Sequence, residues 1–255
     1  MPGLRRIDHL AVAIPAYNEA DGIAGFLSEL ADALAGEAGR VSLVVADDVS
    51  TDDTLHVVRG VSGLPSGVEI IVDEGAVNGG HGPTVVRAYR RCLELGADVV
   101  AQVDGDGQFE ADDFAPLLAA VRAGADVATG RRVARVDPWF RVVLSRLLVV
   151  LSRLAFGARR ADVNCPFRVY RAPVLADLLG DVDTDALVPH VLLTMLEARS
   201  GVAHVEIEVR HRVRRGEEAT GTMWQGGAAV WRLARFAGRA LREVLRFRLT
   251  LRRAG

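Results

Sequence analysis

The stretch HLAVAIPAYNEADG at residues 9–22 decides the fold class. It opens with a short, almost wholly apolar run (9–14), passes into a polar loop, and leads to an amphipathic segment that extends to about Leu34. A second apolar run, VSLVVA (41–46), is rich in β-branched residues and ends in two acids. Short apolar runs separated by amphipathic segments of helical length indicate parallel strands that helices bury on both faces.

The same alternation continues through the first half of the chain. Further apolar runs lie at 68–73, 97–103 and 125–130, and helical patterns run through Cys92 and over 112–122. We therefore expect an α/β fold, with a mostly parallel central sheet and helices on both faces. Ligands bind beyond the carboxyl ends of the strands in such sheets, and the informative polar residues of this chain stand at those ends.

The second half of the chain has a different pattern of apolar and charged residues. Segment 138–157 is strongly apolar but contains three arginines, each of which would cost about 3 kcal/mol at a bilayer centre, so we do not expect it to span a membrane. The alternating run 202–213 predicts a strand. Residues 224–253 place eight arginines among large apolar residues, a pattern that predicts a basic amphipathic helix. Such a helix suits either a membrane surface or packing on the protein's own core.

The charges are distributed unevenly. The chain has 31 basic and 33 acidic residues, and all the basic ones are arginine, which excludes chemistry that needs a lysine. Residues 1–125 hold 20 acids and 8 arginines, whereas residues 126–255 hold 13 acids and 23 arginines. Two cysteines are too few for a disulfide framework and fit a reducing cytosol. We expect a metal in the acidic half, anions such as diphosphates or lipid headgroups at the basic half, and no nucleic-acid partner.

The motif Asp104-Gly105-Asp106 follows a buried strand. Two carboxylates this close repel each other unless a cation or hydrogen-bond donors neutralise them, and hard oxygen ligands favour Mg²⁺ or Mn²⁺. Gly105 permits a tight turn, and Gln108 adds a neutral donor and acceptor nearby. A solvated turn in which Asp106 caps a helix is the competing interpretation of this motif on its own.

Two other predicted strands end in similar chemistry. Asp47 and Asp48 follow the second strand, and one of them is placed to accept hydrogen bonds from a nucleobase. The loop after the first strand, 15–19, offers the ring of Tyr17 for stacking. Three strand ends that present acids and an aromatic ring around one crevice indicate a nucleotide-diphosphate site with a divalent ion. Because no GxGxxG follows the first strand and no P-loop is present, dinucleotide and P-loop sites lose support.

A run of motifs resembles one family. These are VAIPAYNEADGI (12–23), VVADDVSTDDT (44–54), NGGHGPTVVRAY (78–89), VAQVDGDGQ (100–108), ATGRR (128–132) and DVNCPFRVYRAPVL (162–175). Their order and spacing resemble inverting family 2 glycosyltransferases of the GT-A fold. The chain looks most like the branch of dolichol-phosphate mannosyltransferases and polyprenyl-phosphate glycosyltransferases, and the match runs from about residue 9 to 221.

The resemblance implies roles for particular residues. Asp104, Gly105 and Asp106 would form the DxD motif, with Asp106 and Gln108 at the metal. Arg132 would lie beside the donor diphosphate, and Asp162 opens a stretch that ends in Phe167-Arg168. The expected donor nucleotide site, which combines the family positions with the neighbouring loop residues, comprises Pro15, Ala16, Tyr17, Asn18, Glu19, Ala46, Asp48, Gly80, His81, Asp104, Gly105 and Gln108.

The chain departs from the family pattern near 211–218. The branch has an arginine followed by Gly-Glu-Ser-Lys there, whereas this chain lacks the lysine, which is a phosphate ligand. Either Arg212, Arg214 or Arg215 takes over that role or it is unfilled, and we place Arg168 with these arginines at the acceptor phosphate. The following residues 219–221 and the basic tail resemble soluble bacterial members without transmembrane anchors.

The expected reaction moves a sugar from a nucleotide diphosphate to an acceptor with inversion. The metal and Arg132 would stabilise the charge that develops on the leaving diphosphate, so Asp106, Arg132 and Asp162 are the predicted catalytic residues. A phosphate acceptor is already an anion and needs only cations to hold it, whereas a hydroxyl needs a general base, for which Asp162 is the candidate. A salt bridge to Arg159 or Arg160, or a helix cap, is the structural alternative for Asp162.

Two other functions stay open. The same donor site could serve a hydroxyl or amine acceptor in small-molecule metabolism, or the chain could be a non-catalytic module that binds nucleotide sugars. We predict a glycosyltransferase domain over 1–221, with a nucleotide-binding half of about 1–130 and an acceptor half of about 131–221, followed by the helical tail 222–255. The N-terminus lacks the apolar core of a secretory signal, so we expect a cytoplasmic protein, with peripheral contact at the inner face of an anionic membrane through the basic tail.

Overall fold

The protein is described by a computed structural model that covers residues 6–133, 162–212 and 229–253. Its strands are β1 (His9–Ala16), β2 (Arg40–Asp47), β3 (Val68–Glu74), β4 (Val99–Gln102), β5 (Val127–Val133), β6 (Arg168–Arg171) and β7 (His204–Arg210). Its helices are α1 (Ile23–Leu34), α2 (Thr54–Gly60), α3 (His81–Glu94), the short 3₁₀ turn η1 (Ala111–Asp113), α4 (Phe114–Arg122), α6 (Ala172–Gly180), α7 (Pro189–Ser200) and α8 (Ala229–Arg253).

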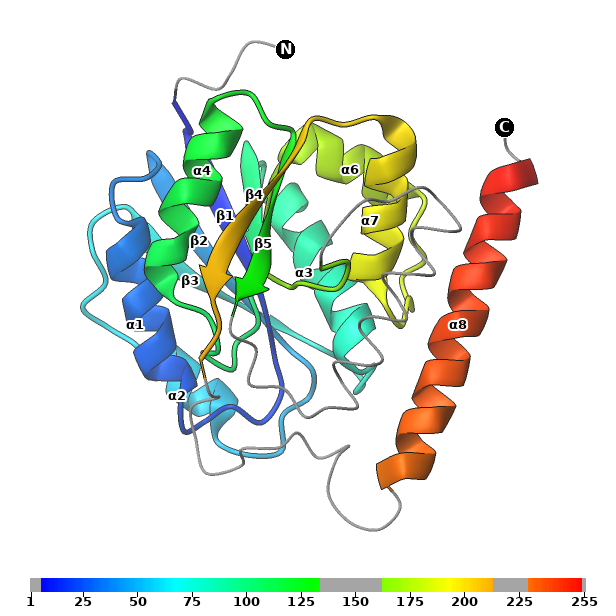
Figure 1. Ribbon diagram of the computed structural model, residues 1–255. Helices are drawn as coiled ribbons and strands as arrows, with labels where there is room; N and C mark the ends of the chain where they lie inside the picture. The colour runs from blue at the N-terminus through cyan, green and yellow to red at the C-terminus, as the bar shows by residue number, and fades with distance from the viewer. Residues whose placement is uncertain (1–5, 134–161, 213–228, 254–255) are drawn as a thin grey trace.

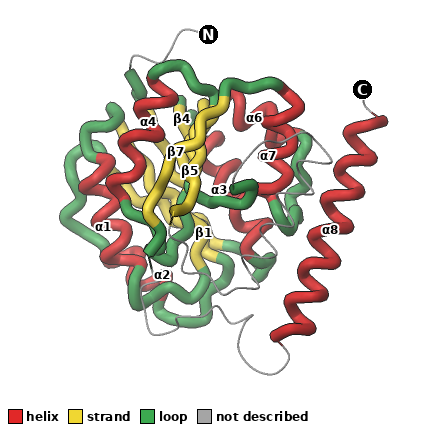
Figure 2. Tube along the Cα trace, in the orientation of Figure 1, coloured by secondary structure: helices red, strands yellow, loops and turns green. Residues whose placement is uncertain are grey.

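All these strands join one sheet in the order β3-β2-β1-β4-β6-β5-β7. Strands β1 to β4 run parallel, and β7 runs parallel to β5, but β6 is antiparallel to both of its neighbours, β4 and β5. Figure 2 shows the sheet in yellow between layers of red helices. The expected α/β fold with a mostly parallel sheet is confirmed, and strands from both predicted halves of the chain share it.

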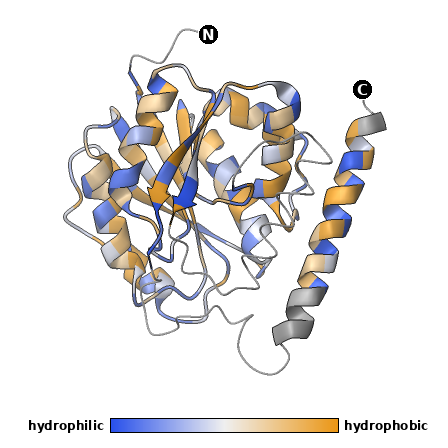
Figure 3. Cartoon of the chain, viewed as in Figure 1, coloured by the Kyte–Doolittle hydropathy of each residue, from blue (hydrophilic) through white to orange (hydrophobic). Residues whose placement is uncertain are grey.

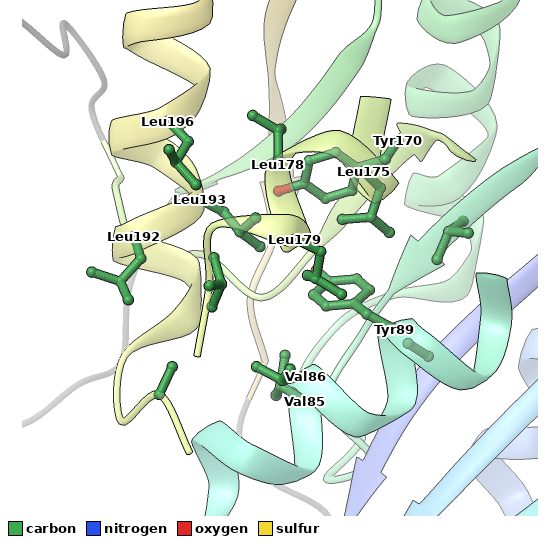
Figure 4. Close-up of a cluster of buried hydrophobic side chains, with 14 of the residues drawn as sticks. Val85, Val86, Tyr89, Tyr170, Leu175, Leu178, Leu179, Leu192, Leu193 and Leu196 are labelled. Carbon is green, nitrogen blue, oxygen red and sulfur yellow. The ribbon is translucent and has the colours of Figure 1, made fainter. Parts of the chain in front are cut away.

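The two faces of the sheet pack against different helices because successive side chains of a strand point to opposite faces. On β1, Leu10, Val12 and Ile14 pack with α1 and α4, whereas Ala11 and Ala13 face α3, α6 and α7. Figure 4 shows the second core, where Tyr89 of α3 lies close to the leucines of α6 and α7. Both faces of β1 are therefore dry, which explains why its residues 10–14 are all apolar.

Several boundaries differ from the sequence prediction. The strand expected at 97–103 is β4, Val99–Gln102, because the Asp98 carboxylate binds the backbone N–H groups of Asp8 and His9 just before it. The strand expected at 125–130 starts at Val127 and continues to Val133. Strand β6 was not predicted, since four residues with an arginine at each end show no apolar pattern. The apolar segment 138–157 lies outside the described residues.

Helix α8 packs along the core, beside α7 (Figure 1). Ala240, Val244 and Leu251 are buried against the α6–α7 core. Glu243 also accepts hydrogen bonds from the backbone N–H groups of Leu187 (2.8 Å) and Val188 (3.1 Å), at the start of α7. Core packing, one of the two interpretations of the basic tail, is therefore present. Among helices of the described ranges, none is long and apolar enough to cross a membrane.

Candidate active site at the carboxyl edge of the sheet

Three of the predicted site loops meet at one edge of the sheet. The backbone N–H of Asp48 donates to the carbonyl of Ala16 at 2.9 Å, and that of Gly105 donates to the carbonyl of Pro15 at 3.2 Å. The end of β1 is therefore flanked by the loop after β2 on one side and by the loop after β4 on the other. The parallel strand order thus brings the acidic loops together, as the sequence predicts. Ala46 itself is fully buried in β2, beside Pro15.

The loop after β1 is fixed by polar contacts with the loop after β2. Asn18 adopts a left-handed conformation (φ 54°), and its side-chain oxygen accepts a hydrogen bond from the Thr51 N–H at 2.8 Å. The Glu19 N–H donates to the Thr54 hydroxyl oxygen at 2.8 Å. Tyr17 remains 37% exposed. Asn18 and Glu19 thus order the loop, while the Tyr17 ring is the member of this loop that is available for stacking.

The two acids at the end of β2, Asp47 and Asp48, are buried and hydrogen-bonded by neutral groups. Asp47 accepts hydrogen bonds from the N–H and hydroxyl of Ser50. Asp48 accepts them from the N–H groups of Gly79 and Gly80, both at 2.8 Å. An ionised carboxylate can accept about four hydrogen bonds, so Asp48 can hold this glycine loop and still accept from a base. A pocket of about 420 Å³ opens beside Asp48 and the glycine loop.

The glycine loop leads directly into α3. Gly80 has a φ of +87°, a conformation that side chains other than glycine rarely adopt, and His81 begins the helix. The His81 Nε2 lies 3.8 Å from the Asp104 carboxylate. By binding Gly79 and Gly80, Asp48 therefore sets the position from which His81 reaches the loop after β4. This brings Asp48, His81 and Asp104 together, as expected of a shared site.

The DxD segment passes close to β1. A Cβ atom added to Gly105 would lie 3.1 Å from the Pro15 carbonyl oxygen, tighter than most real contacts. The absence of a side chain therefore lets the backbone of this segment approach β1 and make its hydrogen bond. Asp104 and Asp106, on either side, are half-buried. Gly105 thus has a packing role, in addition to the site role expected of it.

The donor set of this segment fits a hard divalent cation. The Asp104 carboxylate accepts a hydrogen bond from the Gln102 amide at 3.0 Å, and Asp106 accepts one from the Gln108 N–H at 3.1 Å. Two partly exposed carboxylates and the Gln108 amide offer oxygen ligands of the kind Mg²⁺ and Mn²⁺ bind while keeping waters and phosphate oxygens. Within the described ranges, no group of three or more His, Cys, Asp or Glu residues could hold a metal alone. Phosphate oxygens and water would have to complete the coordination.

The other two predicted catalytic residues bind each other. Arg132 Nε donates to the Asp162 carboxylate at 2.7 Å and its Nη2 at 3.1 Å, and both side chains are largely buried. This two-point ion pair gives Asp162 a structural role, with Arg132 as one partner; Arg159 and Arg160 lie outside the described residues. A carboxylate held by a guanidinium is a weak base, so the pair suits electrostatic positioning better than proton abstraction.

Arg168 requires a correction. We expected it at an acceptor phosphate, but its side chain is fully buried beneath β6. It donates to the Glu197 carboxylate (3.2 Å), the Tyr170 hydroxyl oxygen (3.0 Å) and the Thr194 hydroxyl oxygen (2.9 Å). Burial alone lowers its pKa, but the acidic neighbours Tyr170 and Glu197 raise the pKa above its ordinary value. Arg168 is therefore a charged core residue with no access to a ligand.

The expected phosphate ligands near β7 fall into two groups. Arg212 forms ion pairs with Glu29 (2.9 Å) and Glu110 (3.1 Å), and it donates to the Gly107 carbonyl at 2.8 Å. In this arrangement it fastens the DxD loop to α1 and is not directed at an open anion site. Arg214 and Arg215 lie outside the described residues.

Sequence reasoning missed two residues beside the site. Gln102 is fully buried and orients Asp104, and a single glutamine in an apolar strand just before the acids could have signalled it. His190, near the start of α7, is 3% exposed, and its ring centre lies 6.4 Å from that of His81. Burial and the nearby charges of Arg168, His81 and Arg132 hold the pKa of His190 well below its usual value.

Comparison with known proteins agrees with this geometry. The model of Glycosyl transferase family 2 matches residues 11–178, more than half of the chain. The undecaprenyl-phosphate mannosyltransferase of Micrococcus luteus is 29% identical over 93% of this chain and 98% of its own length. The polyprenol monophosphomannose synthase of Mycolicibacterium smegmatis is 28% identical over 81% of this chain and 78% of its own.

A third relative is longer. The undecaprenyl-phosphate 4-deoxy-4-formamido-L-arabinose transferase of Edwardsiella ictaluri is 27% identical over 88% of this chain, but the match spans only 66% of that transferase. Among solved structures, glucosyl-3-phosphoglycerate synthase of Mycobacterium tuberculosis, in complex with Mn²⁺ and uridine diphosphate, aligns with a TM-score of 0.65 at 15% identity. That alignment covers 94% of this chain and 80% of the synthase. The chain therefore belongs to Glycosyl transferase family 2 and has the GT-A fold.

Proposed function

We propose that this glycosyltransferase moves a sugar from a nucleotide-diphosphate sugar to a polyprenyl-phosphate acceptor, with inversion and with Mg²⁺ or Mn²⁺. The observation that carries the proposal is the convergence of Asp48, His81, Asp104 and Asp106 at the end of β1. Relatives that match most of the chain are named as transferases to polyprenyl phosphates. We further propose that the protein works in the cytoplasm, at the inner face of the membrane that holds such a lipid.

The chain's own residues divide the work. Tyr17 would stack on the base, and the Asp48 carboxylate would accept from it while holding the glycine loop. Asp104, Asp106 and the Gln108 amide would bind the divalent ion, which when present neutralises charge on the leaving diphosphate. Asp162 keeps the Arg132 guanidinium in one orientation through two hydrogen bonds. That fixed positive charge would lie beside the diphosphate at no reorganisation cost during the reaction.

The acceptor assignment follows from acid–base chemistry. The carboxylate named as the candidate base, Asp162, is bound by Arg132, and His190 is buried with a pKa well below its usual value, which makes it a weak base. A lipid phosphate needs no base, because its oxygen is already an anion. A hydroxyl or amine acceptor would need a base within about 3 Å. A small-molecule glycosyltransferase therefore remains the second candidate, and transfer to a neutral sugar or alcohol would select it.

The donor can be identified by mass action. A thermal-shift panel of UDP and GDP sugars, with and without Mn²⁺, should show one donor that raises the melting temperature only with the metal, since a ligand that binds only the folded state stabilises it. Asp106→Asn should remove that metal-dependent shift and lower turnover by about 10²–10³-fold. Asp53→Asn, at an exposed acid on the loop before α2, is the matched control. Full activity of Asp106→Asn would refute the metal role.

A further inference from the structure

Helix α8 has two apolar faces, and only one of them is used by the core. Ala240, Val244 and Leu251 point inward and are buried. Leu241, Leu245 and Leu249 repeat every fourth residue and are 37%, 47% and 56% exposed. At 1.5 Å per residue they form a stripe about 12 Å long on another side of the helix. We call these three residues the outer leucine stripe.

Arginines border this stripe. Leu245 has Arg242 three positions before it and Arg248 three positions after it, and Arg246 stands three positions before Leu249; residues three apart are neighbours on a helix surface. Arg242 and Arg246 are exposed, as are Arg235 and Arg239 on the preceding turns. Figure 3 shows apolar and charged residues alternating along α8.

The only acid of α8 is turned away from this surface. Glu243 binds the Leu187 and Val188 N–H groups at the start of α7. On its outer surface, the described part of α8 therefore offers leucines and arginines without a carboxylate. Asp181, Asp183 and Asp185 lie across a pocket of about 490 Å³ from Arg239, Arg242 and Arg246, none of which forms an ion pair among the described residues. Those arginines remain solvated.

We propose that the outer leucine stripe and the flanking arginines dock this protein on an anionic lipid surface while the inner face of α8 stays on the core. Apolar side chains of an interfacial helix enter the headgroup boundary, and Lys and Arg on its flanks bind anionic headgroups. A second copy of the chain fits poorly, because pairing two such stripes would bring arginines against arginines. The inference extends the proposed function, whose acceptor is a membrane lipid, but it depends on different residues.

The test uses the full chain and vesicles that contain no acceptor lipid. The intact protein should float with vesicles of 70% phosphatidylcholine and 30% phosphatidylglycerol (on the order of physiological anionic content) but not with phosphatidylcholine alone. Binding should weaken as salt rises. The variant Leu241→Gln/Leu245→Gln/Leu249→Gln, which keeps helix-forming residues and the charge, should lose at least about tenfold in vesicle affinity, which is about 1.4 kcal/mol.

Controls separate docking from folding and from donor binding. Val77→Gln, at a 76% exposed residue in the loop after β3, should bind vesicles like the parent. The triple variant should keep the parent's melting temperature and its metal-dependent donor shift. Because the vesicles contain no acceptor lipid, failure of the proposed reaction would not affect the vesicle-binding result. Truncation is avoided, because it would also remove Glu243 from α7.

Two results would overturn the proposal. One is equal vesicle binding by the triple variant and the parent. The other is absence of parent binding to anionic vesicles together with a dimer, seen by light scattering, that the triple variant converts to a monomer. The second result would assign the outer leucine stripe to contact between two copies of the chain.

Discussion

The acids at the carboxyl edge of the sheet and the acid beneath β6 are satisfied by different partners. At the edge, Asp47, Asp48 and Asp104 accept hydrogen bonds from neutral groups: backbone N–H groups, a hydroxyl and an amide. Beneath β6, Glu197 accepts a hydrogen bond from the Tyr170 hydroxyl and also forms an ion pair with the guanidinium of Arg168. Neutral donors orient a carboxylate without cancelling its charge, whereas an arginine orients the carboxylate and also cancels its charge.

This difference shows two uses of charge in the molecule. The first half of the chain keeps negative charge at the edge, which favours a cation there, while the second half uses arginines partly to neutralise its own buried acids. A high arginine content is thus not by itself a sign of an anion site. Arg168 lies in a family motif and yet serves the core.

The largest expected effect comes from breaking the buried pair. Arg168→Met should lower the free energy of unfolding by about 3–5 kcal/mol, because it removes the guanidinium that offsets the buried charge of Glu197. Urea denaturation followed by circular dichroism measures this. The double variant Arg168→Met/Glu197→Gln should recover part of the loss. A single variant within 1 kcal/mol of the parent would show that the arginine is not needed to hold the acid.

At the edge, loss of an acid should cost less. Asp48→Ala should lower the free energy of unfolding by about 1.5–3 kcal/mol, since hydrogen bonds from two backbone N–H groups to a charged acceptor are lost. Asp48→Asn keeps the shape of the side chain but removes its charge. Its free energy of unfolding should lie between those of the parent and Asp48→Ala. Asp112→Ala, at an exposed acid, serves as the control. If Asp48→Asn equals the parent in stability but not in donor binding, the charge serves the ligand rather than the fold.

His190 tests the interior region through pH. Its folded-state pKa is lowered by burial and by neighbouring positive charges, so the unfolded chain binds the proton more tightly. The stability it contributes is present above about pH 6.5 and is lost as pH falls through the folded-state pKa. We expect a slope of up to about 1.4 kcal/mol per pH unit below pH 6.5. His190→Gln should flatten the slope between pH 7.5 and 5.5, whereas parallel curves would contradict this. His9, whose pKa is also lowered, contributes equally to both proteins.

The smallest effect is expected for an exposed pair. Arg131 of β5 pairs with Glu208 of β7, and their side chains are 43% and 62% exposed. Arg131→Gln should change the free energy of unfolding by less than about 0.5 kcal/mol at physiological salt, because solvent screens such a pair. Urea denaturation of this variant beside Arg168→Met isolates the effect of burial. A loss near that of Arg168→Met would mean that burial does not set the difference.

Much of the fold could be predicted because its first half obeys simple periodicity. The strands up to β4 are short, apolar and separated by helices of ordinary length, so their parallel order places Asp48 and Asp104 at one edge. Strand β6 could not be predicted in this way, since its register depends on pairing with Gln102 and Thr129 far along the chain. The position of each acidic loop follows from the strand that it ends, whereas the position of the Arg168 side chain depends on tertiary contacts.

Some features of the candidate site could likewise be predicted from the sequence, and others could not. The position of Asp48 follows from strand order, but its hydrogen bonds to Gly79 and Gly80 join loops 31 residues apart and carry no sequence signature. The pairing of Arg132 with Asp162 likewise depends on how β5 and the start of β6 meet. The residue types indicated the chemistry, and only the fold showed which arginines are already bound by acids.

The carboxylate of Glu243 makes the tail a structural partner of the catalytic domain. Gly82 of α3 lies so close to the Ala186 carbonyl that an added Cβ would be 2.2 Å from it, and the next two residues, 187 and 188, are the ones Glu243 binds. Exchange of C-terminal helices between related transferases would therefore succeed only when the incoming helix supplies an acid at this turn. In evolutionary terms, the outer residues of α8 can vary more freely, while its inner turn is constrained by the domain beneath it.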